Sequence, residues 1–145
     1  MFRGYLNEQA RYDKCFADGW DLTGDLAMRD SDGYYWFVGR ADDVIKSAGH
    51  LIGPFEVEDV FMQHPAVAEC GVVGAPDAER GQVVMAFVVL KQAHPDLAQL
   101  TRELQEYIKA QLAPYKYPRA IEFIDALPRT ETGKVQRFKL RQAGK

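Results

Sequence analysis

The stretch VVMAFVVLKQAHPDLAQLTRELQEYIKAQL, residues 83–112, contains the two patterns that decide the fold. Its first eight residues are all apolar, which predicts a central strand that is covered on both faces. Beyond Asp96, a residue that can cap a helix, leucine or isoleucine recurs every three or four positions from Leu97 to Leu112, and Pro114 ends the pattern. This second half predicts an amphipathic helix that packs on the sheet.

Weaker patterns on both sides of this stretch predict a further helix and two further strands. Pro54 stands at the first turn of a helix with acidic residues near its start, and this helix is expected to end before Pro65. Residues 67–73 and 121–124 are rich in strand-forming residues. Residues 41–145 therefore predict an α+β fold, in which helices pack on a three-stranded sheet.

The beginning of the chain has a different character. Short apolar runs on either side of Gly33 predict a β-hairpin. Trp20 and Trp36 lie here with several other aromatic residues, and a segment of this length cannot bury them all. We expect residues 1–40 to be poorly ordered alone or to pack against a neighbouring domain, and residues 41–145 to fold without them.

The composition excludes several classes of protein. The chain has 145 residues, 47% hydrophobic and 27% charged, which is typical of a globular domain. No apolar run approaches the roughly 18 residues of a membrane span, and charged residues interrupt any signal-peptide core near the start. We therefore expect a cytoplasmic protein without a membrane span. Cys15, Cys70 and the three histidines lack zinc-ligand spacing, so we expect no metal site from them and no disulfide framework.

The charge is unevenly distributed along the chain. Residues 116–145 hold eight Lys and Arg against three acidic residues, a net charge of +5, whereas the residues before them have a net charge of -8. Such a basic tail can bind a phosphate-bearing molecule, a nucleic acid or an acidic surface, or it can be a solvated face. Its aromatic residues, among them Tyr117 and Phe138, have strand and proline contexts that favour packing, so we expect no nucleic-acid partner.

Four segments combine glycine with charged residues: DLTGD at 21–25, GRADDVIK at 39–46, SAGHLIGPFEVE at 47–58 and PRTETGKVQR at 128–137. Lys134 is either a solvated lysine on a mobile loop or a donor that reaches a phosphate. Asp25 either satisfies nearby backbone N–H groups or accepts hydrogen bonds from a vicinal diol. Arg40 either forms a surface ion pair or donates to a nucleotide. Spacing alone does not decide between these alternatives.

The four segments together resemble the adenylate-forming superfamily of acyl-CoA synthetases, peptide-synthetase adenylating domains and luciferases, and the resemblance covers the whole chain. Three stretches of sequence are most similar to medium-chain fatty-acyl and benzoate-type CoA ligases: KSAGHLIGPFEVE at 46–58, LAPYKYPR at 112–119 and GKVQRFKLR at 133–141. The family's large N-terminal domain, with its acyl pocket and phosphate loop, has no counterpart here. The resemblance implies that residues 1–40 are the end of that large domain and that residues 41–145 are the whole mobile C-terminal domain.

The resemblance also implies a reaction in two steps. A small-molecule carboxylic acid attacks the α-phosphate of ATP, which carries Mg in the full-length enzyme, and gives an acyl-adenylate and pyrophosphate. Coenzyme A then displaces AMP. One C-terminal domain serves both steps by rotating against its partner, the large domain of the same enzyme. The alternative is a non-catalytic interaction module derived from such an enzyme.

The resemblance assigns roles to individual residues on both sides of the boundary between the two domains. Asp25 would hold the ribose hydroxyls of ATP, and Arg40 would contact the same nucleotide. Asp42 would be the hinge whose backbone torsions change during the rotation.

Two further segments would serve the two steps. Lys134 would enter the site for adenylation and place positive charge where negative charge builds up. Lys46 and Gly49 would face the site in the second conformation and border the channel for the pantetheine arm of coenzyme A. Leu51 departs from the family, because many relatives have arginine there, and this departure puts a phosphate contact at that position in question.

Overall fold

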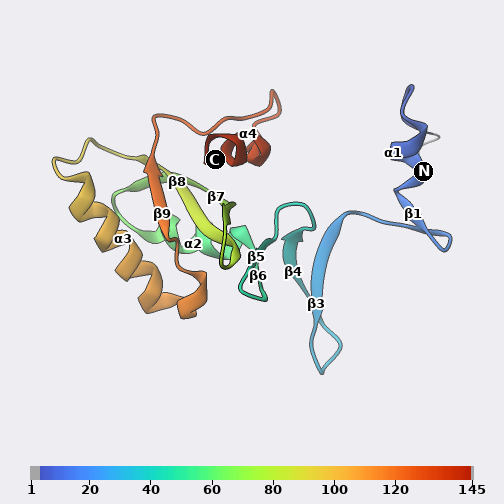
Figure 1. Ribbon diagram of the computed structural model, residues 1–145, viewed down its shortest axis with the longest axis horizontal. Helices are drawn as coiled ribbons and strands as arrows, with labels where there is room; N and C mark the ends of the chain where they lie inside the picture. The colour runs from blue at the N-terminus through green and yellow to red at the C-terminus, as the bar shows by residue number, and fades with distance from the viewer. Residues whose placement is uncertain (1–3, 145) are drawn as a thin grey trace. The chain divides into compact units, whose positions relative to one another are not determined.

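The computed structural model describes residues 4–144, which divide into two units (Figure 1). Unit 1 is Met1–Asp42 and unit 2 is Asp43–Lys145. This boundary lies two residues beyond Arg40, where the sequence pattern divides the chain into residues 1–40 and 41–145. That unit 1 is the end of a larger domain stays a prediction.

Unit 1 consists of short elements. They are helix α1 (Gln9–Asp13), the antiparallel pair β1 (Phe16–Ala17) and β2 (Trp20–Asp21), and the antiparallel hairpin β3 (Asp25–Arg29) and β4 (Tyr35–Arg40). Asp30 closes the predicted hairpin: its carboxylate accepts hydrogen bonds from the indole Nε1 of Trp36 and the backbone N–H groups of Asp32 and Tyr34. The Trp36 bond foremost, with help from the backbone donors, holds the pKa of Asp30 below its usual value.

Unit 1 leaves aromatic side chains on the surface. Trp20 of β2 is 77% exposed, Tyr35 of β4 is 71% exposed, and Tyr34, Trp36 and Phe37 are exposed as well. This agrees with the expectation that so short a segment cannot bury them. A surface of this kind is typical of a segment that packs against another domain.

The α+β class is confirmed in unit 2, whose sheet has five strands. They are β5 (Ile45–Ser47), β6 (His50–Ile52), β7 (Val67–Asp77), β8 (Gly81–Leu90) and β9 (Ala120–Phe123). The order is β6-β5-β8-β7, and β9 also pairs with β8, in parallel, while the other pairs are antiparallel. The sequence predicted three strands because β5 and β6 are only three residues long, too short to show a two-residue period.

The helices of unit 2 begin and end largely where the sequence predicts. They are α2 (Pro54–Gln63), α3 (Leu97–Gln111), the 3-10 turn η1 (Pro114–Lys116) and α4 (Arg137–Ala143). The Asp96 carboxylate accepts a hydrogen bond from the backbone N–H of Gln99 at 2.9 Å, which confirms the predicted cap of α3. Leu97 is exposed, so the buried stripe of α3 starts at Leu100. Helix α4 was not predicted.

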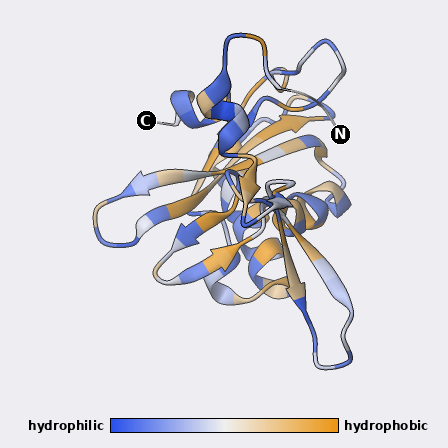
Figure 2. Ribbon diagram, turned by 90° about the vertical axis from the view of Figure 1, so that its right-hand side faces the viewer, coloured by the Kyte–Doolittle hydropathy of each residue, from blue (hydrophilic) through white to orange (hydrophobic). Residues whose placement is uncertain are grey.

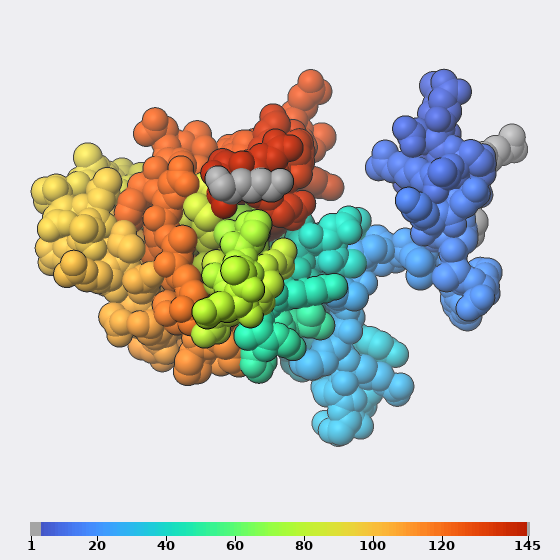
Figure 3. Space-filling model, in the orientation of Figure 1, coloured from blue at the N-terminus to red at the C-terminus, as the bar shows by residue number. Residues whose placement is uncertain are grey.

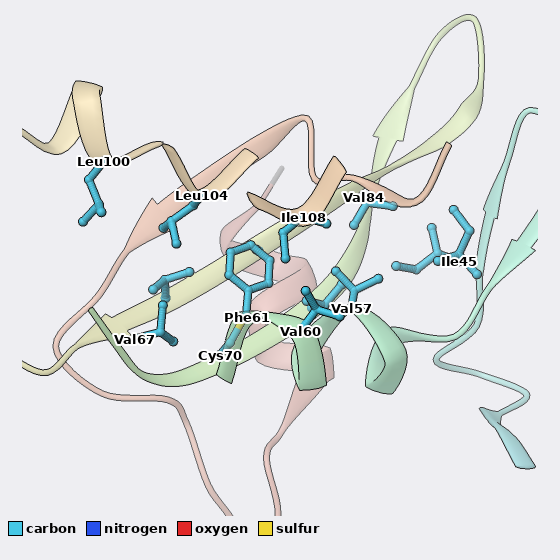
Figure 4. Packing of buried hydrophobic residues seen from close by; sticks show 14 residues of the cluster. Ile45, Val57, Val60, Phe61, Val67, Cys70, Val84, Leu100, Leu104 and Ile108 are labelled. Atoms are coloured by element: carbon cyan, nitrogen blue, oxygen red, sulfur yellow. The ribbon is translucent and has the colours of Figure 1, made fainter. Parts of the chain in front are cut away.

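Strand β8 separates two cores, because successive side chains point to opposite faces of a sheet. Figure 2 shows that hydrophobic residues, in orange, are concentrated in the strands of the sheet. Val84, Ala86 and Val88 face the core that is covered by α2 and α3. In that core, Phe61 of α2 lies beside Leu104 and Ile108 of α3 (Figure 4). Each such side chain contributes about 1.5–3 kcal/mol when fully buried.

The opposite face of the sheet is covered by α4 and the segment that leads to it. Met85 and Phe87 of β8 pack there with Leu127 and Leu140. Gly71 of β7 makes room for this layer, because an added Cβ would lie 2.8 Å from Cδ1 of Leu140. No helix within residues 4–144 is long and apolar enough to cross a membrane.

Candidate functional site

The structure brings the two predicted nucleotide contacts of unit 1 together. Asp25 begins β3 and Arg40 ends β4, and the two residues are opposite each other in the hairpin register. Arg40 Nη1 donates to Asp25 Oδ1 at 2.9 Å and to the carbonyl oxygen of Thr23 at 2.8 Å. The side chains are 50% and 40% exposed, and ion pairs of this exposure contribute about 0–1 kcal/mol. A ligand can therefore replace the pairing at little cost.

The predicted hinge, Asp42, lies between two anchored residues. On one side, the N–H of Ala41 donates to the carbonyl oxygen of Gly24 within unit 1 at 2.8 Å. On the other side, the Asp43 carboxylate accepts a hydrogen bond from Arg141 at 2.9 Å within unit 2. Asp42 is the last residue of unit 1, and it is exposed. That Asp42 is a hinge stays a prediction.

Lys134 stands at the end of a tight turn formed by residues 129–135, which we call the lysine turn. Thr130 donates its N–H to the carbonyl oxygen of Lys134 at 2.8 Å, and its carbonyl and Oγ1 accept from the N–H groups of Gly133 and Lys134 at 2.9 and 3.1 Å. Gly133 has φ +83°, a conformation that favours glycine. The turn is closed by its own hydrogen bonds, and the mobility that its composition predicts stays a prediction.

The Lys134 side chain is exposed, and within residues 4–144 its ammonium group has no partner. The turn projects from the surface of unit 2 in the orange-red part of the chain that precedes α4 (Figure 3). Its backbone is fixed, while its cationic end group is free to contact a phosphate or a carboxylate.

Lys46 and Gly49 belong to the two-stranded hairpin β5–β6. Its two-residue turn consists of Ala48 with φ 47° and Gly49 with φ 82°, both in the left-handed region that matches the twist of the strands. A Cβ added at Gly49 would meet nothing within 4 Å. The position therefore favours glycine because of its left-handed backbone conformation, not because a neighbouring group lies close. Lys46 and Leu51 are exposed.

The β5–β6 hairpin pairs with one end of β8, and its Ile45 and Ile52 side chains are fully buried in the core. Ser47 pairs with Gly81, and the N–H of Ala48 donates to the carbonyl oxygen of Arg80 at 3.0 Å. The side chain of Gln82 adds a bond, because its Oε1 accepts the N–H of Lys46 at 2.9 Å. Gly74 provides the space for Gln82, since an added Cβ there would lie 2.9 Å from the amide group.

The structure does not bring the lysine turn and the β5–β6 hairpin together. Figure 1 shows them apart in unit 2, with the lysine turn beside α4 and the hairpin at the far end of β8. Unit 2 therefore carries two separate candidate surfaces.

The excess positive charge of the tail is partly paired with the acidic residues that precede it. Four of its cations form ion pairs of 2.6–2.9 Å: Lys116 with Glu56, Arg129 with Glu69, Arg137 with Glu58, and Arg141 with Asp43. Burial raises the pKa of Glu58, against the opposing effect of hydrogen bonds from Val72 and Arg137. Within residues 4–144 there is no group of three or more side chains that could hold a metal ion.

Sequence reasoning missed three residues that shape these surfaces: Arg129, Glu69 and Gln82. Arg129 and Glu69 are 60 positions apart, and Gln82 contacts a backbone 36 positions away. No local pattern marks such pairs, because they depend on which strands become neighbours. The only signal in the sequence was that Arg129 lies in the same glycine-containing segment as Lys134.

Comparison with known proteins identifies the class. Residues 56–134 match the AMP-binding enzyme C-terminal domain, and the chain belongs to this family. It is 48% identical over 142 residues to 4-hydroxybutyrate–CoA ligase 1 of Metallosphaera sedula and 52% identical over 145 residues to the human mitochondrial acyl-coenzyme A synthetase ACSM2B. These alignments cover 98% and 97% of the chain but 25% of each relative, so the chain spans a quarter of their length.

The solved structures agree. The anthranilate CoA ligase AuaEII, crystallised in complex with anthranoyl-AMP, superposes with a TM-score of 0.80 and 45% identity, over 93% of this chain and 26% of the ligase. The resemblance to acyl-CoA synthetases that the sequence motifs indicated is thereby confirmed.

Proposed function

We propose that this chain is the lid domain of an AMP-forming acid–CoA ligase, joined to the end of the large adenylating domain. The full reaction converts a carboxylic acid, ATP and coenzyme A into acyl-CoA, AMP and pyrophosphate. The observation that carries the proposal is Lys134, an exposed cation without a partner in the described structure, held on an ordered turn. The 45% identity to a ligase that was crystallised with an acyl-adenylate supports it.

In the first step, Lys134 acts on the reacting groups. The attack of a carboxylate on the α-phosphate of ATP concentrates negative charge, and a preorganised cation stabilises that charge as it develops. Because the turn is fixed by backbone hydrogen bonds, Lys134 reaches or leaves the site through a movement of unit 2 as a whole. ATP is accompanied by Mg in this proposal.

Asp25 and Arg40 hold the nucleotide. The two acceptor oxygens of a carboxylate suit the vicinal hydroxyls of ribose, and an arginine fork suits a phosphate or a ribose oxygen. In the chain alone, Arg40 donates to Asp25 and so keeps both side chains at the end of the β3–β4 hairpin. This position directly precedes the hinge.

Asp42 is the hinge. Ala41 is hydrogen-bonded within unit 1 and Asp43 within unit 2, so the change in backbone torsions concentrates on the residue between them. Hinges of this kind are short segments at the ends of secondary-structure elements.

In the second step, the β5–β6 hairpin faces the site. Lys46 and Gly49 then border the path of the pantetheine arm of coenzyme A, and the exposed turn at Gly49 allows close approach of that chain. Since this hairpin lies apart from the lysine turn, one surface leaves the site when the other enters.

The large N-terminal domain is the partner that this proposal requires. The exposed aromatic residues of the β3–β4 hairpin support it, because an apolar surface of this size is stable when another domain covers it. The substrate is a small-molecule carboxylic acid, and its identity is set in the large domain.

A hybrid ligase tests the proposal against the alternative of a non-catalytic interaction module. In this hybrid, our chain replaces the matching quarter of the Metallosphaera sedula ligase, to which it is 48% identical. We expect the hybrid to form acyl-CoA and to exchange pyrophosphate into ATP faster than the truncated ligase. We expect the 145-residue chain alone to form no acyl-adenylate at micromolar concentration.

Two outcomes would contradict the proposal. Acyl-adenylate formation by the chain alone would show that it is not a lid that depends on a large domain. A folded hybrid no more active than the truncated ligase would favour the interaction module.

A further inference from the structure

One arginine ties the lysine turn to the central sheet. Nη1 of Arg129 donates to the carbonyl oxygen of Gly133 at 2.7 Å, and Nη2 donates to Oε1 of Glu69 at 2.7 Å. Both bonds come from one planar guanidinium group, so together they fix the turn relative to the carboxylate.

The two partners of Arg129 belong to different parts of the structure. The Gly133 carbonyl is in the peptide that leads directly into Lys134, so this bond holds the backbone from which the lysine side chain extends. Glu69 lies in β7 and is opposite Val89 of β8 in the sheet register. The arginine thus connects the turn to the most extensively paired strands of unit 2.

Apolar packing holds only one end of the turn. Val135, its last residue, packs against the core of Leu127 and Leu140, whereas residues 129–134 are all exposed. The hydrogen bonds within the turn set its shape. Within the described residues, the ion pair with Glu69 is the side-chain contact that holds the exposed part of the turn against the sheet.

The same contact adds little to overall stability. The side chains of Arg129 and Glu69 are each 41% exposed, and exposed ion pairs contribute little to folding. Catalysis is more sensitive, because a displacement of about 1 Å at a reacting group can cost about a hundredfold in rate. Loss of the pair should therefore affect rate more than folding.

On the basis of the proposed function, we propose that Arg129 and Glu69 are positioning residues for Lys134. They hold the lysine turn at the place that adenylation requires and play no part in thioester formation. Neither residue touches the reacting atoms in this proposal, and both act through the backbone at Gly133.

The first test is kinetic and uses the hybrid ligase. We expect Arg129→Ala and Glu69→Ala to lower the kcat of ATP–pyrophosphate exchange by about tenfold or more, with the KM for ATP nearly unchanged. Thioester formation from supplied acyl-adenylate should keep its rate. Glu69→Gln retains an acceptor oxygen and should restore most of the exchange rate, whereas Arg129→Lys, with a single ammonium group, should not.

The second test measures the turn itself in the 145-residue chain. We expect hydrogen exchange of the Thr130 and Lys134 amides to accelerate at least severalfold in Arg129→Ala and Glu69→Ala, while amides of β8 keep their protection. Arg102→Ala is the matched control, since Arg102 is exposed on α3 and has no partner within the described residues. This variant should change neither measurement.

The results separate the two proposals. If Arg129→Ala slows both half-reactions equally, or leaves exchange kinetics and amide protection unchanged, the positioning role is wrong. Suppose that the amides lose protection in both alanine variants while Lys134→Ala adenylates normally. Arg129 and Glu69 then do hold the lysine turn, but the proposed function of Lys134 is wrong.

Discussion

The lysine turn and the β5–β6 hairpin are both short and closed by a glycine with positive φ, but they are attached to the sheet in different ways. The exposed part of the lysine turn, residues 129–134, is tied to β7 by the Arg129 side chain. The β5–β6 hairpin pairs with β8 at Gly81, donates a hydrogen bond to Gln82, and packs into the core through the fully buried Ile45 and Ile52. The hairpin is therefore held by the core, whereas the lysine turn is held mainly by one ion pair.

Under the proposed function, this difference shows how one small domain would serve two reactions. Each surface is fixed to the same sheet, so an exchange between them would require movement of the unit. Asp42 lies between the hydrogen-bonded residues Ala41 and Asp43. If this account holds, variants of the hinge and of each surface should separate the two half-reactions.

Apart from the loss of Lys134 itself, the largest effect is expected at the hinge. Asp42→Pro in the hybrid ligase would fix φ near -65° and favour one of the two arrangements of unit 2. The half-reaction that needs the other arrangement should fall by about a hundredfold, which corresponds to about 2.7 kcal/mol. Asp42→Ala is the control that removes the side chain without restricting φ. Single-turnover assays of each half-reaction measure the effect, and an equal loss in both would indicate misfolding.

A smaller effect is expected at the hairpin. Gln82→Ala removes the acceptor for the Lys46 N–H and should slow thioester formation from acyl-adenylate by about tenfold, while ATP–pyrophosphate exchange stays nearly unchanged. Gln82→Glu keeps an acceptor oxygen at the same distance and serves as the conservative variant. A slower exchange reaction in Gln82→Ala would show that the hairpin and the lysine turn are not independent.

The smallest effect is expected on the stability of unit 2 when unit 1 is removed. Both surfaces belong to unit 2, and among residues 4–144 the members of its two cores all come from unit 2. Limited proteolysis should give a stable product that begins near Ala41. Its melting temperature should lie within about 5 °C of the value for the intact chain, which corresponds to about 1 kcal/mol. Complete loss of structure would show that unit 2 depends on unit 1.

Local patterns were sufficient for most of the fold. The apolar run of β8, the stripe of α3 and the Asp96 cap each follow from the residues within a few positions. Strands β5 and β6 were too short to show a period. Helix α4 was missed because only Leu140 is buried in it, so it lacks an apolar stripe.

The candidate site was predictable to a smaller extent. The residue types and order of the four motifs indicated Lys134, Asp25 and Arg40, but not what holds them. That Arg40 pairs with Asp25 follows from a hairpin register that the sequence leaves open. The contacts of Arg129 and Gln82 depend on strand neighbours far apart in the chain, which no local pattern specifies.

The central claim is that the lysine turn serves adenylation and the β5–β6 hairpin serves thioester formation. The most direct test is single-turnover kinetics of both half-reactions in the Lys134→Ala variant of the hybrid ligase. Loss of one preorganised donor costs on the order of 3 kcal/mol, so we predict that acyl-adenylate formation slows at least about a hundredfold. Thioester formation from supplied acyl-adenylate should proceed at nearly the original rate. Normal adenylation by this variant, or an equal slowing of both steps, would contradict the account.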